Sequence, residues 1–553
     1  MKKLLLLFFI VLIPGMDYAQ DFAEDIPVSW QLNLQQRNTP IELPPLDLEA
    51  IHAEDVINDL DKGQPWRYGL TRPIVIDIER DGVWTVLPNN AGRIWQVAIK
   101  STDAINVSVN LDMFYIPKGG RFFLFNGDQS DVSVPYTDAS NRSSANLGSW
   151  FLQGDVVWLE YFEPPSVSEE VQLSVKSVIH GYRMGHITSI AQNIRGLNDS
   201  GSCNYDVNCS IGEDFDDLKD VIKKAVTLLN LGNGYLCTAS LVNNTAADKT
   251  PFLLTANHCL QDSDPEFWSV RFNWISPTPV CGEDAESADI QTNFTMSGGQ
   301  LRASSSKSDF ALVELFNTIP ESWDIAFAGW NNSDAMPRFE VGIHHPNGDI
   351  MKVCRDDSGA TKDVASGTDV WLIGGGAAGT GNGWEIGTTE SGSSGSPLFN
   401  EKGHIIGQLY GGQSFCDGTS NNGQFDIYGR FAVSWDYGNT PETRLKDWLD
   451  PINSGQTTIE TLQNILNVQD IELTGTLEIF PNPANTYITV MNSRYPNLSY
   501  QFFNVLGQKI ISGAVSNTMN VIPVASFAEG IYFLRLKDEE SNQEITKKIL
   551  IQK

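Results

Sequence analysis

Short runs in which apolar and polar residues alternate recur along most of the chain. In the first 200 residues they are VWTVLP (83–88), RIWQVAI (93–99), INVSVNLDMFYI (105–116), RFFLFN (121–126) and DVVWLEYF (155–162). A period of two, with β-branched and aromatic residues between Asn, Gly and Asp turns, is typical of strands. We therefore predict a β-sandwich over residues 21–195.

The strand pattern continues in two further segments. Residues 196–466 contain SDFALVEL (308–315), IIGQLYGG (405–412) and a predicted short terminal helix over 441–450. Residues 471–553 show seven strand-like runs and have neither cysteine nor histidine, so we expect no catalysis there. The sequence thus predicts an all-β protein of several domains, as expected for 553 residues.

The first 20 residues are predicted to be a signal peptide. Lys2 and Lys3 precede the apolar run Leu4–Ile13, which is too short to span a bilayer. No later stretch has the length of a membrane-spanning helix. We therefore expect a secreted protein, soluble or tethered by something other than a helix.

Charge and cysteine content narrow the functional classes. The 37 basic and 68 acidic residues give a net charge of −31, which argues against nucleic acid and a basic membrane patch as partners. All seven cysteines lie between Cys203 and Cys416. In an oxidising compartment this predicts disulfides within one domain and one thiol left over.

Most histidines have environments that indicate no chemistry. We predict His52 and His404 to be exposed, and the adjacent His344 and His345 to end a strand with their side chains on opposite faces. The remaining two, His180 and His186, have no cysteine or paired carboxylate at ligand spacing. We therefore expect no metal and no cofactor.

His258 differs from the others. It ends the apolar run FLLTANHCL (252–260) and directly precedes Cys259. A disulfide there, most naturally to Cys237 on the preceding predicted strand, would fix the backbone that carries the imidazole, as a general base requires. The alternative is a packed histidine at a strand end.

Two further residue types complete a possible nucleophilic triad. Asp309 stands just before the predicted strand of SDFALVEL, and TTESGSSGSPLFN (388–400) contains four serines between glycines. The chain order His…Asp…Ser is one of the known orders of such triads. A flexible serine-rich loop is the alternative.

Residues 200–451 resemble the bacterial lysyl endopeptidases, which are serine proteases of the chymotrypsin fold. The ordered blocks that carry the resemblance are SGSCN (200–204), CTASLVNNTA (237–246), FLLTANHC (252–259), SDFALVEL (308–315), AGW (328–330), IHHPN (343–347), GSSGSP (392–397), GQLYGG (407–412), YGRF (428–431) and RLKDWLDP (444–451). The resemblance implies a double β-barrel over 196–466 that cleaves after lysine through an acyl-enzyme.

The resemblance also assigns roles to single residues. It implies that His258, Asp309 and Ser394 form the triad and that the amides of Gly392 and Ser394 form the oxyanion hole. It implies the disulfides Cys203–Cys416, Cys209–Cys281 and Cys237–Cys259, which leaves Cys354 as a buried free thiol.

The specificity pocket departs from that of trypsin. Thr388 occupies the trypsin position for the pocket acid, and the resemblance places the acid instead at Asp426. Tyr410 stands where the family has histidine. Gly411 and, after a shift of two residues, Trp371 are the other expected contacts of the substrate.

The segments on either side of residues 196–466 have expected roles of their own. Residues 21–195 are expected to be a propeptide removed by a cut near Arg195-Gly196, and Ser393 stands where trypsin has the acid that receives a new N-terminus. The tail, 471–553, resembles type A sorting domains of the type IX secretion system through FPNPANTYITV (480–490), NVLGQKI (504–510), GIYFLRL (530–536) and KKILI (547–551). It is expected to be a small immunoglobulin-like sandwich.

Two other functional classes stay open from the sequence. An inactive protease homologue could bind ligands at the cell surface, but such proteins usually lose a member of the triad. An esterase is disfavoured by the chain order and by the absence of a strand–GxSxG–helix arrangement. We expect a monomer that meets protein and peptide substrates and the secretion machinery.

Overall fold

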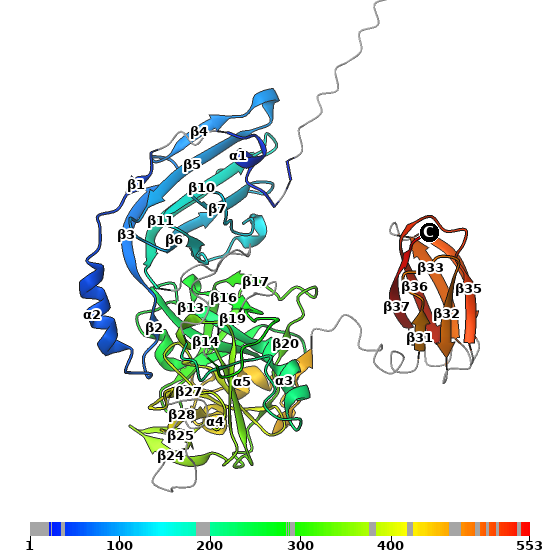
Figure 1. Ribbon diagram of the computed structural model, residues 1–553. Coiled ribbons are helices and arrows are strands. Elements are labelled where there is room, and N and C mark those ends of the chain that lie inside the picture. Colours follow the sequence, from blue (N-terminus) through cyan, green and yellow to red (C-terminus); the bar gives the residue numbers. More distant parts are fainter. Residues whose placement is uncertain are drawn as a thin grey trace, which may run out of the picture. The chain divides into compact units, whose positions relative to one another are not determined.

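The computed structural model consists mainly of β-strands, and the prediction of an all-β protein is confirmed. It describes residues 22–553 except 24, 35–38, 184–199, 284, 286, 288–293, 375–382, 417–423, 464–476, 493–497, 505–507, 516–518 and 539–543. The chain forms two compact units, Met1–Asn464 and Ile465–Lys553 (Figure 1). Among the described residues, no helix has the length and apolar character needed to cross a membrane.

The N-terminal part of the first unit, up to residue 183 and here called the first domain, contains a sandwich of two five-stranded sheets. One sheet contains β1 (Ile41–Glu42), β4 (Val83–Val86), β5 (Arg93–Lys100), β7 (Arg121–Asn126) and β10 (Val156–Glu163). The other contains β3 (Gly69–Asp77), β6 (Asn106–Tyr115), β8 (Leu147–Gly148), β9 (Leu152–Gln153) and β11 (Gln172–Gly181). Alternate apolar side chains of both sheets, such as Val97, Val109 and Leu159, form one core, as the alternating sequence predicts.

Two helices accompany this sandwich, α1 (Val28–Gln31) and α2 (Leu48–Asn58). The sequence reading did not predict α2, because only Ile51 and Asp55 on it are buried and its apolar stripe is weak. Its N-terminus is capped by the carboxylate of Asp47, which accepts a hydrogen bond from the Ala50 amide at 3.1 Å. After α2 the chain passes through β2 (Trp66–Arg67) before it enters the sandwich at β3.

The rest of the first unit is built on two large sheets, as in a double β-barrel protease. The eight-stranded sheet contains β2, β13 (Val226–Asn230), β14 (Tyr235–Val242), β15 (Phe252–Ala256), β16 (Ser269–Phe272), β17 (Phe294–Ser297), β18 (Gly299–Ser305) and β19 (Phe310–Leu315). The ten-stranded sheet contains β12 (Tyr205–Asp206), β21 (Trp330–Asn331), β22 (Glu340–His344), β23 (Lys352–Asp356), β24 (Thr361–Ala365), β25 (Thr368–Ile373), β26 (Pro397–Asn400), β27 (Ile405–Gly412), β28 (Asp426–Arg430) and β29 (Thr458–Ile459). A pair of short strands, β20 (Ala326–Phe327) and β30 (Leu462–Gln463), stands apart from both sheets.

Helices in this part are short. They are α3 (Asp216–Ile222), α4 (Phe431–Asp436) and α5 (Lys446–Leu449). The 3₁₀ turns of the unit are η1 (Pro88–Asn90), η2 (Asp138–Ser140), η3 (Lys223–Ala225), η4 (Asn257–Leu260), η5 (Pro265–Phe267), η6 (Pro346–Gly348) and η7 (Pro441–Thr443). The predicted helix over 441–450 is therefore divided into η7 and α5, with Leu445 and Leu449 buried.

The second unit is a small sandwich. Its strands are β31 (Leu477–Phe480), β32 (Tyr487–Asn492), β33 (Leu498–Asn504), β34 (Lys509–Val515), β35 (Met519–Pro523), β36 (Gly530–Asp538) and β37 (Glu544–Ile551). They pair as a three-stranded and a four-stranded sheet around a core that includes Val490, Phe502 and Leu534. The strand-like runs predicted for the tail agree with this arrangement.

One histidine prediction is wrong. His404 was expected in an exposed turn, but its side chain is only 4% exposed. His404 lies in the tight connection between β26 and β27, where its amide donates to the Asn400 side chain and its carbonyl accepts from the Asn400 amide. His52 is exposed, as predicted, and His186 lies outside the described residues.

Candidate active site

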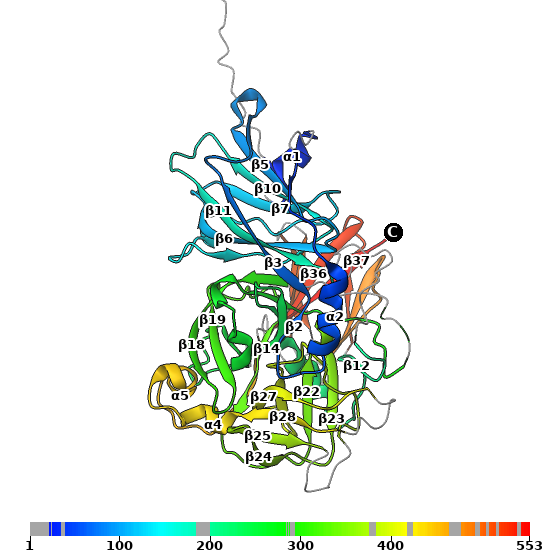
Figure 2. The ribbon, with the colours of Figure 1, turned by 90° about the vertical axis from the view of Figure 1, so that its left-hand side faces the viewer.

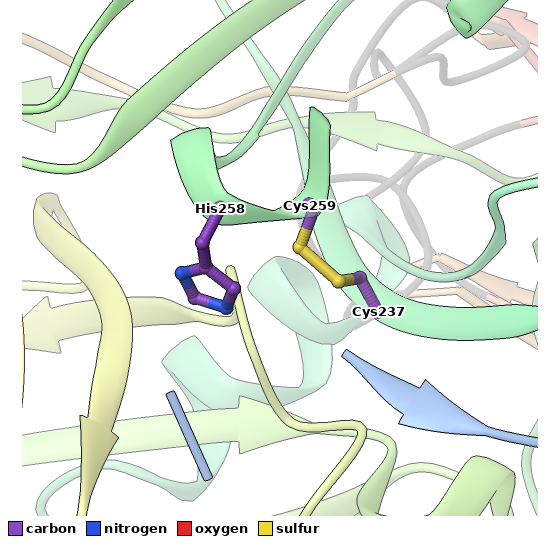
Figure 3. Close-up of side chains that lie close together, drawn as sticks. All are labelled: Cys237, His258 and Cys259. Carbon is purple, nitrogen blue, oxygen red and sulfur yellow. A yellow bond between two sulfur atoms is a disulfide. The ribbon is translucent and has the colours of Figure 1, made fainter. Parts of the chain in front are cut away.

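His258 is held by its own backbone. It lies in η4, directly after the buried strand β15, and the next residue forms the disulfide Cys237–Cys259 with the neighbouring strand β14 (Figure 3). Both cysteines are fully buried. The imidazole therefore projects from a rigid turn, as a general base requires.

The three side chains of Figure 3 also have the composition of a small metal site, since their ligand atoms lie within 4.8 Å of one another. The two sulfur atoms are bonded to each other, however. A disulfide has no thiolate to offer a metal ion. These three residues lie close together because of the disulfide beside His258, and they do not form a metal site.

Asp309 orients the imidazole. Its Oδ2 lies 2.8 Å from Nδ1 of His258, and its Oδ1 accepts from the His258 amide at 3.0 Å. A carboxylate at Nδ1 selects the tautomer in which Nε2 is the free acceptor. Asp309 has a φ of +52°, a conformation that few non-glycine residues adopt and that is held here by the Asn257 amide on its carbonyl.

Ser394 lies in the tight loop that precedes β26. Gly392 and Gly395 in this loop have φ values of +89° and +82°. A Cβ atom at Gly395 would lie 2.1 Å from Oγ1 of Thr255, so the loop packs too closely against β15 for any side chain there. Thr238 fastens the loop from β14, because its Oγ1 donates to the Gly392 carbonyl and its amide donates to the Ser394 carbonyl.

The neighbouring serines have other partners. The Ser393 hydroxyl lies 2.8 Å from Nδ1 of the buried His344, and the Ser391 hydroxyl donates to the carbonyl of Asp59. The hydroxyl of Ser394 donates instead to the main-chain carbonyl of Lys62 at 3.2 Å. Nε2 of His258 has no hydrogen-bond partner among the described residues.

Asp426, the first residue of β28, lies fully buried at the base of a polar pocket beside this loop. One carboxylate oxygen accepts hydrogen bonds from three side chains, Trp384 Nε1 at 2.8 Å, Thr389 Oγ1 at 2.7 Å and Ser414 Oγ at 2.6 Å. The other oxygen lies 2.7 Å from the ammonium of Lys62. The pocket is therefore built to hold a cation.

Glycines of β27 form the wall of this pocket. A Cβ atom at Gly412, whose φ is +152°, would lie 2.1 Å from the Asp426 carboxylate. At Gly411 a Cβ atom would lie 3.0 Å from the amide nitrogen of Gly63. Tyr410 precedes them, and its ring centroid is 6.0 Å from that of His258. Small residues here leave room for a main chain and a long side chain to enter.

The structure does not bring Trp371 to the pocket. Its indole lies in a buried cluster that also contains Trp384 and Tyr428, and it donates to the Ile406 carbonyl at 2.9 Å. Trp371 has this carbonyl as its hydrogen-bond acceptor, and no hydrogen bond joins its indole to Asp426 among the described residues. Trp384 contacts the pocket acid instead, a residue that sequence reasoning missed together with Thr389, Ser414 and Lys62. Thr389 lies in the segment TTESGSSGSPLFN (388–400), but the order of residues in that segment does not indicate a pocket residue.

Three disulfides join the same cysteines that the resemblance implies: Cys203–Cys416, Cys209–Cys281 and Cys237–Cys259. Cys354 is a free thiol in a fully buried position, as expected. Burial raises its pKa well above the usual value. It is therefore a packed thiol and not a reactive one.

Buried histidines beside the loop that carries Ser394 predict a loss of stability in acid. The ring of His345 donates from Nδ1 to the Asp349 carbonyl, and burial lowers its pKa to about 4. Between the unfolded value of about 6.5 and 4, the unfolded chain binds more protons, so the free energy of unfolding must fall as the pH is lowered. The loss approaches about 3 kcal/mol for this one group.

Denaturant unfolding at several pH values between 7 and 4.5 measures this effect. In a His345→Gln variant the free energy of unfolding should decline less steeply with falling pH than in the parent. The control variant His52→Gln, which changes an exposed histidine, should decline as steeply as the parent. Identical slopes in parent and His345→Gln would show that His345 does not contribute.

Comparison with known proteins agrees with this geometry. The family model of the C-terminal domain of lysyl endopeptidase matches residues 197–429, which include all the site residues named above except Lys62 and its neighbours in the first domain. This part of the chain is therefore similar to the lysyl endopeptidases. A lysyl endopeptidase of Pseudomonas aeruginosa is 27% identical over 312 residues, which are 53% of this chain and 63% of that protein. The chain therefore spans less than two thirds of that relative.

The tail has its own match. The family model of the secretion system C-terminal sorting domain covers residues 478–552. A domain of this type directs export through the type IX system, to the secreted or surface-attached state. Among solved structures, PorZ, described as a surface component of the type-IX secretion system of Porphyromonas gingivalis, aligns with 59% of this chain and 42% of that one at 8% identity. The TM-score of that alignment is 0.13.

Proposed function

We propose that this chain is a secreted serine endopeptidase that cleaves peptide bonds on the carboxyl side of lysine and, more slowly, of arginine. Ser394 attacks the scissile carbonyl carbon, and its proton passes to Nε2 of His258. His258 then donates the proton to the leaving amine, and a water molecule hydrolyses the resulting ester with His258 again as the base. Asp309 holds the ring and stabilises its charged form.

The negative charge of the tetrahedral intermediate needs its own donors. The amides of Gly392 and Ser394 are assigned to this oxyanion hole, because the positive φ of Gly392 allows the chain to turn there. Loss of one such donor typically costs about 2.7–4 kcal/mol of transition-state stabilisation. Thr238 supports the hole by anchoring the carbonyls of the same two residues.

The single observation that carries the specificity is the ammonium group held by Asp426. A buried carboxylate without a cation is unfavourable, so neutral side chains should bind poorly. The cation in the pocket has five acceptor contacts between 2.7 and 3.0 Å, made by Asp426, Thr389 and Ser414. This cluster suits a compact ammonium better than a planar guanidinium, which favours lysine over arginine.

The flanking parts fit a secreted zymogen. Residues 21–195 are assigned as a propeptide and 471–553 as the part that meets the type IX machinery, and the mature enzyme is proposed to be a monomer. The proposed cut at Arg195-Gly196 lies outside the described residues. Ser393 is engaged by His344 and carries no charge for a new N-terminus, so activation is assigned to removal of the first domain.

An inactive homologue acting as a surface adhesin is the competing function. It is disfavoured by the geometry, because a binding protein has no need of an imidazole with a carboxylate at Nδ1 and a serine on a strained loop. Loss of any of these residues would not affect adhesion, and all are present.

The cleavage sites in a denatured protein test the proposal. The activated enzyme should produce peptides that end mainly in lysine, with a minority ending in arginine, as mass spectrometry of the digest would show. A digest of the same substrate by the Ser394→Ala chain is the control for contaminating proteases. Cleavage without enrichment of basic residues would refute the assignment of the pocket.

A further inference from the structure

A segment of the first domain lies in the candidate active site. Residues 59–67, here called the strap, connect α2 with β3 and include β2. Near its start, the carbonyl of Asp59 accepts from the Ser391 hydroxyl in the nucleophile loop. At its end, Trp66 and Arg67 pair with Leu236 and Tyr235 of β14, and Figure 2 shows β2 beside this strand.

Lys62, in the middle of the strap, fills the cation pocket. Its side chain is 7% exposed, and its Nζ lies 2.7 Å from Asp426. The same Nζ donates to the hydroxyls and carbonyls of Thr389 and Ser414. A lysine side chain from elsewhere could not enter while these contacts are made.

The main chain at Lys62 is not arranged for hydrolysis. The Ser394 hydroxyl donates its proton to the carbonyl oxygen of Lys62, and no hydrogen bond joins it to His258. Neither the Gly392 amide nor the Ser394 amide donates to that carbonyl oxygen. A nucleophile must instead give its proton to the base, with the carbonyl oxygen bound by the oxyanion donors. The strap thus occupies the site as a blocking group and not as a substrate in position for attack.

Ion pairs hold the strap in place from both sides. Asp55 at the end of α2 binds Arg67 and Arg183, and Asp59 also binds Arg183. The Tyr182 hydroxyl donates to Asp55 as well. Because the strap is anchored within the same chain, Lys62 competes with external lysines at a high effective concentration.

We infer that the strap is an inhibitor built into the first domain, with Lys62 as the residue that fills the lysine pocket. The inference rests on the proposed function, since it uses the same pocket. It adds that the uncut chain is inactive because its own lysine is bound at Asp426. Separation of the first domain withdraws Lys62 and opens the pocket.

The rate at which a lysyl diphenyl phosphonate labels Ser394 in the uncut chain tests this inference, with intact mass used to show that the chain stays full length. Lys62→Met should be labelled at least tenfold faster than the parent, because methionine leaves the buried Asp426 without a cation and the ammonium of the label can displace it. Lys118→Met is the matched control, since Lys118 is an exposed lysine of the same domain, and it should leave the rate unchanged. Equal rates for Lys62→Met and the parent would overturn the inference.

A second measurement avoids the variant altogether, in case Lys62→Met does not fold. Reductive methylation of the uncut parent chain should modify Lys62 at least tenfold more slowly than Lys118, as peptide mapping would show. Equal reactivity, or a cut at Lys62-Gly63 in the chain before the first domain is lost, would overturn the inference.

The two proposals can fail separately. The activated enzyme is assayed on an external lysyl peptide in the same series. Activity there with no effect of Lys62 would refute the strap inference alone, whereas an activated enzyme that ignores lysine would refute the proposed function.

Discussion

Replacement of Ser394 by alanine is expected to reduce peptide hydrolysis by on the order of a million-fold, as is typical when the nucleophile of such a triad is removed. The hydroxyl lies on a loop held by Thr238 and by the close approach of Gly395 to Thr255, and the neighbouring hydroxyls of Ser391 and Ser393 are bonded to other groups. Turnover of a lysyl peptide by the activated enzyme and labelling by a fluorophosphonate measure the effect.

Ser396→Ala is the matched control for this experiment. The hydroxyl that it removes lies two residues after Ser394 and forms no hydrogen bond with His258 or Lys62. Most of the activity and all of the labelling should therefore remain. Labelling retained in Ser394→Ala, or lost equally in both variants, would mean that another residue is the nucleophile.

Replacement of Asp426 by asparagine is expected to lower kcat/KM for lysyl substrates by about 10²–10⁴. Breaking a buried ion pair by removing the charge of one partner typically costs about 3–5 kcal/mol, and each 1.36 kcal/mol corresponds to tenfold in rate. If the asparagine oxygen keeps the hydrogen bonds from Trp384, Thr389 and Ser414, its NH₂ group faces the substrate ammonium and cannot accept from it. The change should fall mainly on substrates with a cationic side chain.

Kinetics with a matched pair of peptides, one with lysine and one with norleucine at the cleaved bond, separate this effect from general damage. The ratio of the two kcat/KM values should collapse in Asp426→Asn. Asp369→Asn, on the adjacent strand β25 and partly exposed beside Lys307, should leave the ratio unchanged. An equal loss on both peptides in Asp426→Asn would show that the carboxylate does not select the substrate.

The sequence by itself determined the strands and the order of the candidate catalytic residues. Alternation with a period of two is a local property, so β5, β6 and β10 follow directly from RIWQVAI, INVSVNLDMFYI and DVVWLEYF. The position of His258 at the end of an apolar run and before a cysteine was equally local. Its 2.8 Å contact with Asp309 agrees with the predicted pairing, although the two residues are 51 positions apart.

Only the tertiary structure decided which side chains line the pocket. Trp371 and Trp384 are close to each other in the sequence, but only Trp384 donates a hydrogen bond to Asp426. Which side chain reaches the pocket depends on strand register and on how the sheet closes, and no local pattern encodes either. His404 is another case, since its turn-like sequence indicates exposure whereas its side chain is 4% exposed in the folded chain.

Lys62 is the clearest example of a site residue that no local sequence pattern predicts. It lies 364 residues from Asp426, in a segment without a strand pattern of its own, and nothing near it in the sequence marks a partner for an acid. Two residues so far apart in the sequence pair only in the folded chain, because the pairing requires the first domain to pack against the ten-stranded sheet that carries Asp426. The chemistry of the site was therefore readable in the chain, whereas the residue that occupies it was determined by the packing of one domain on another.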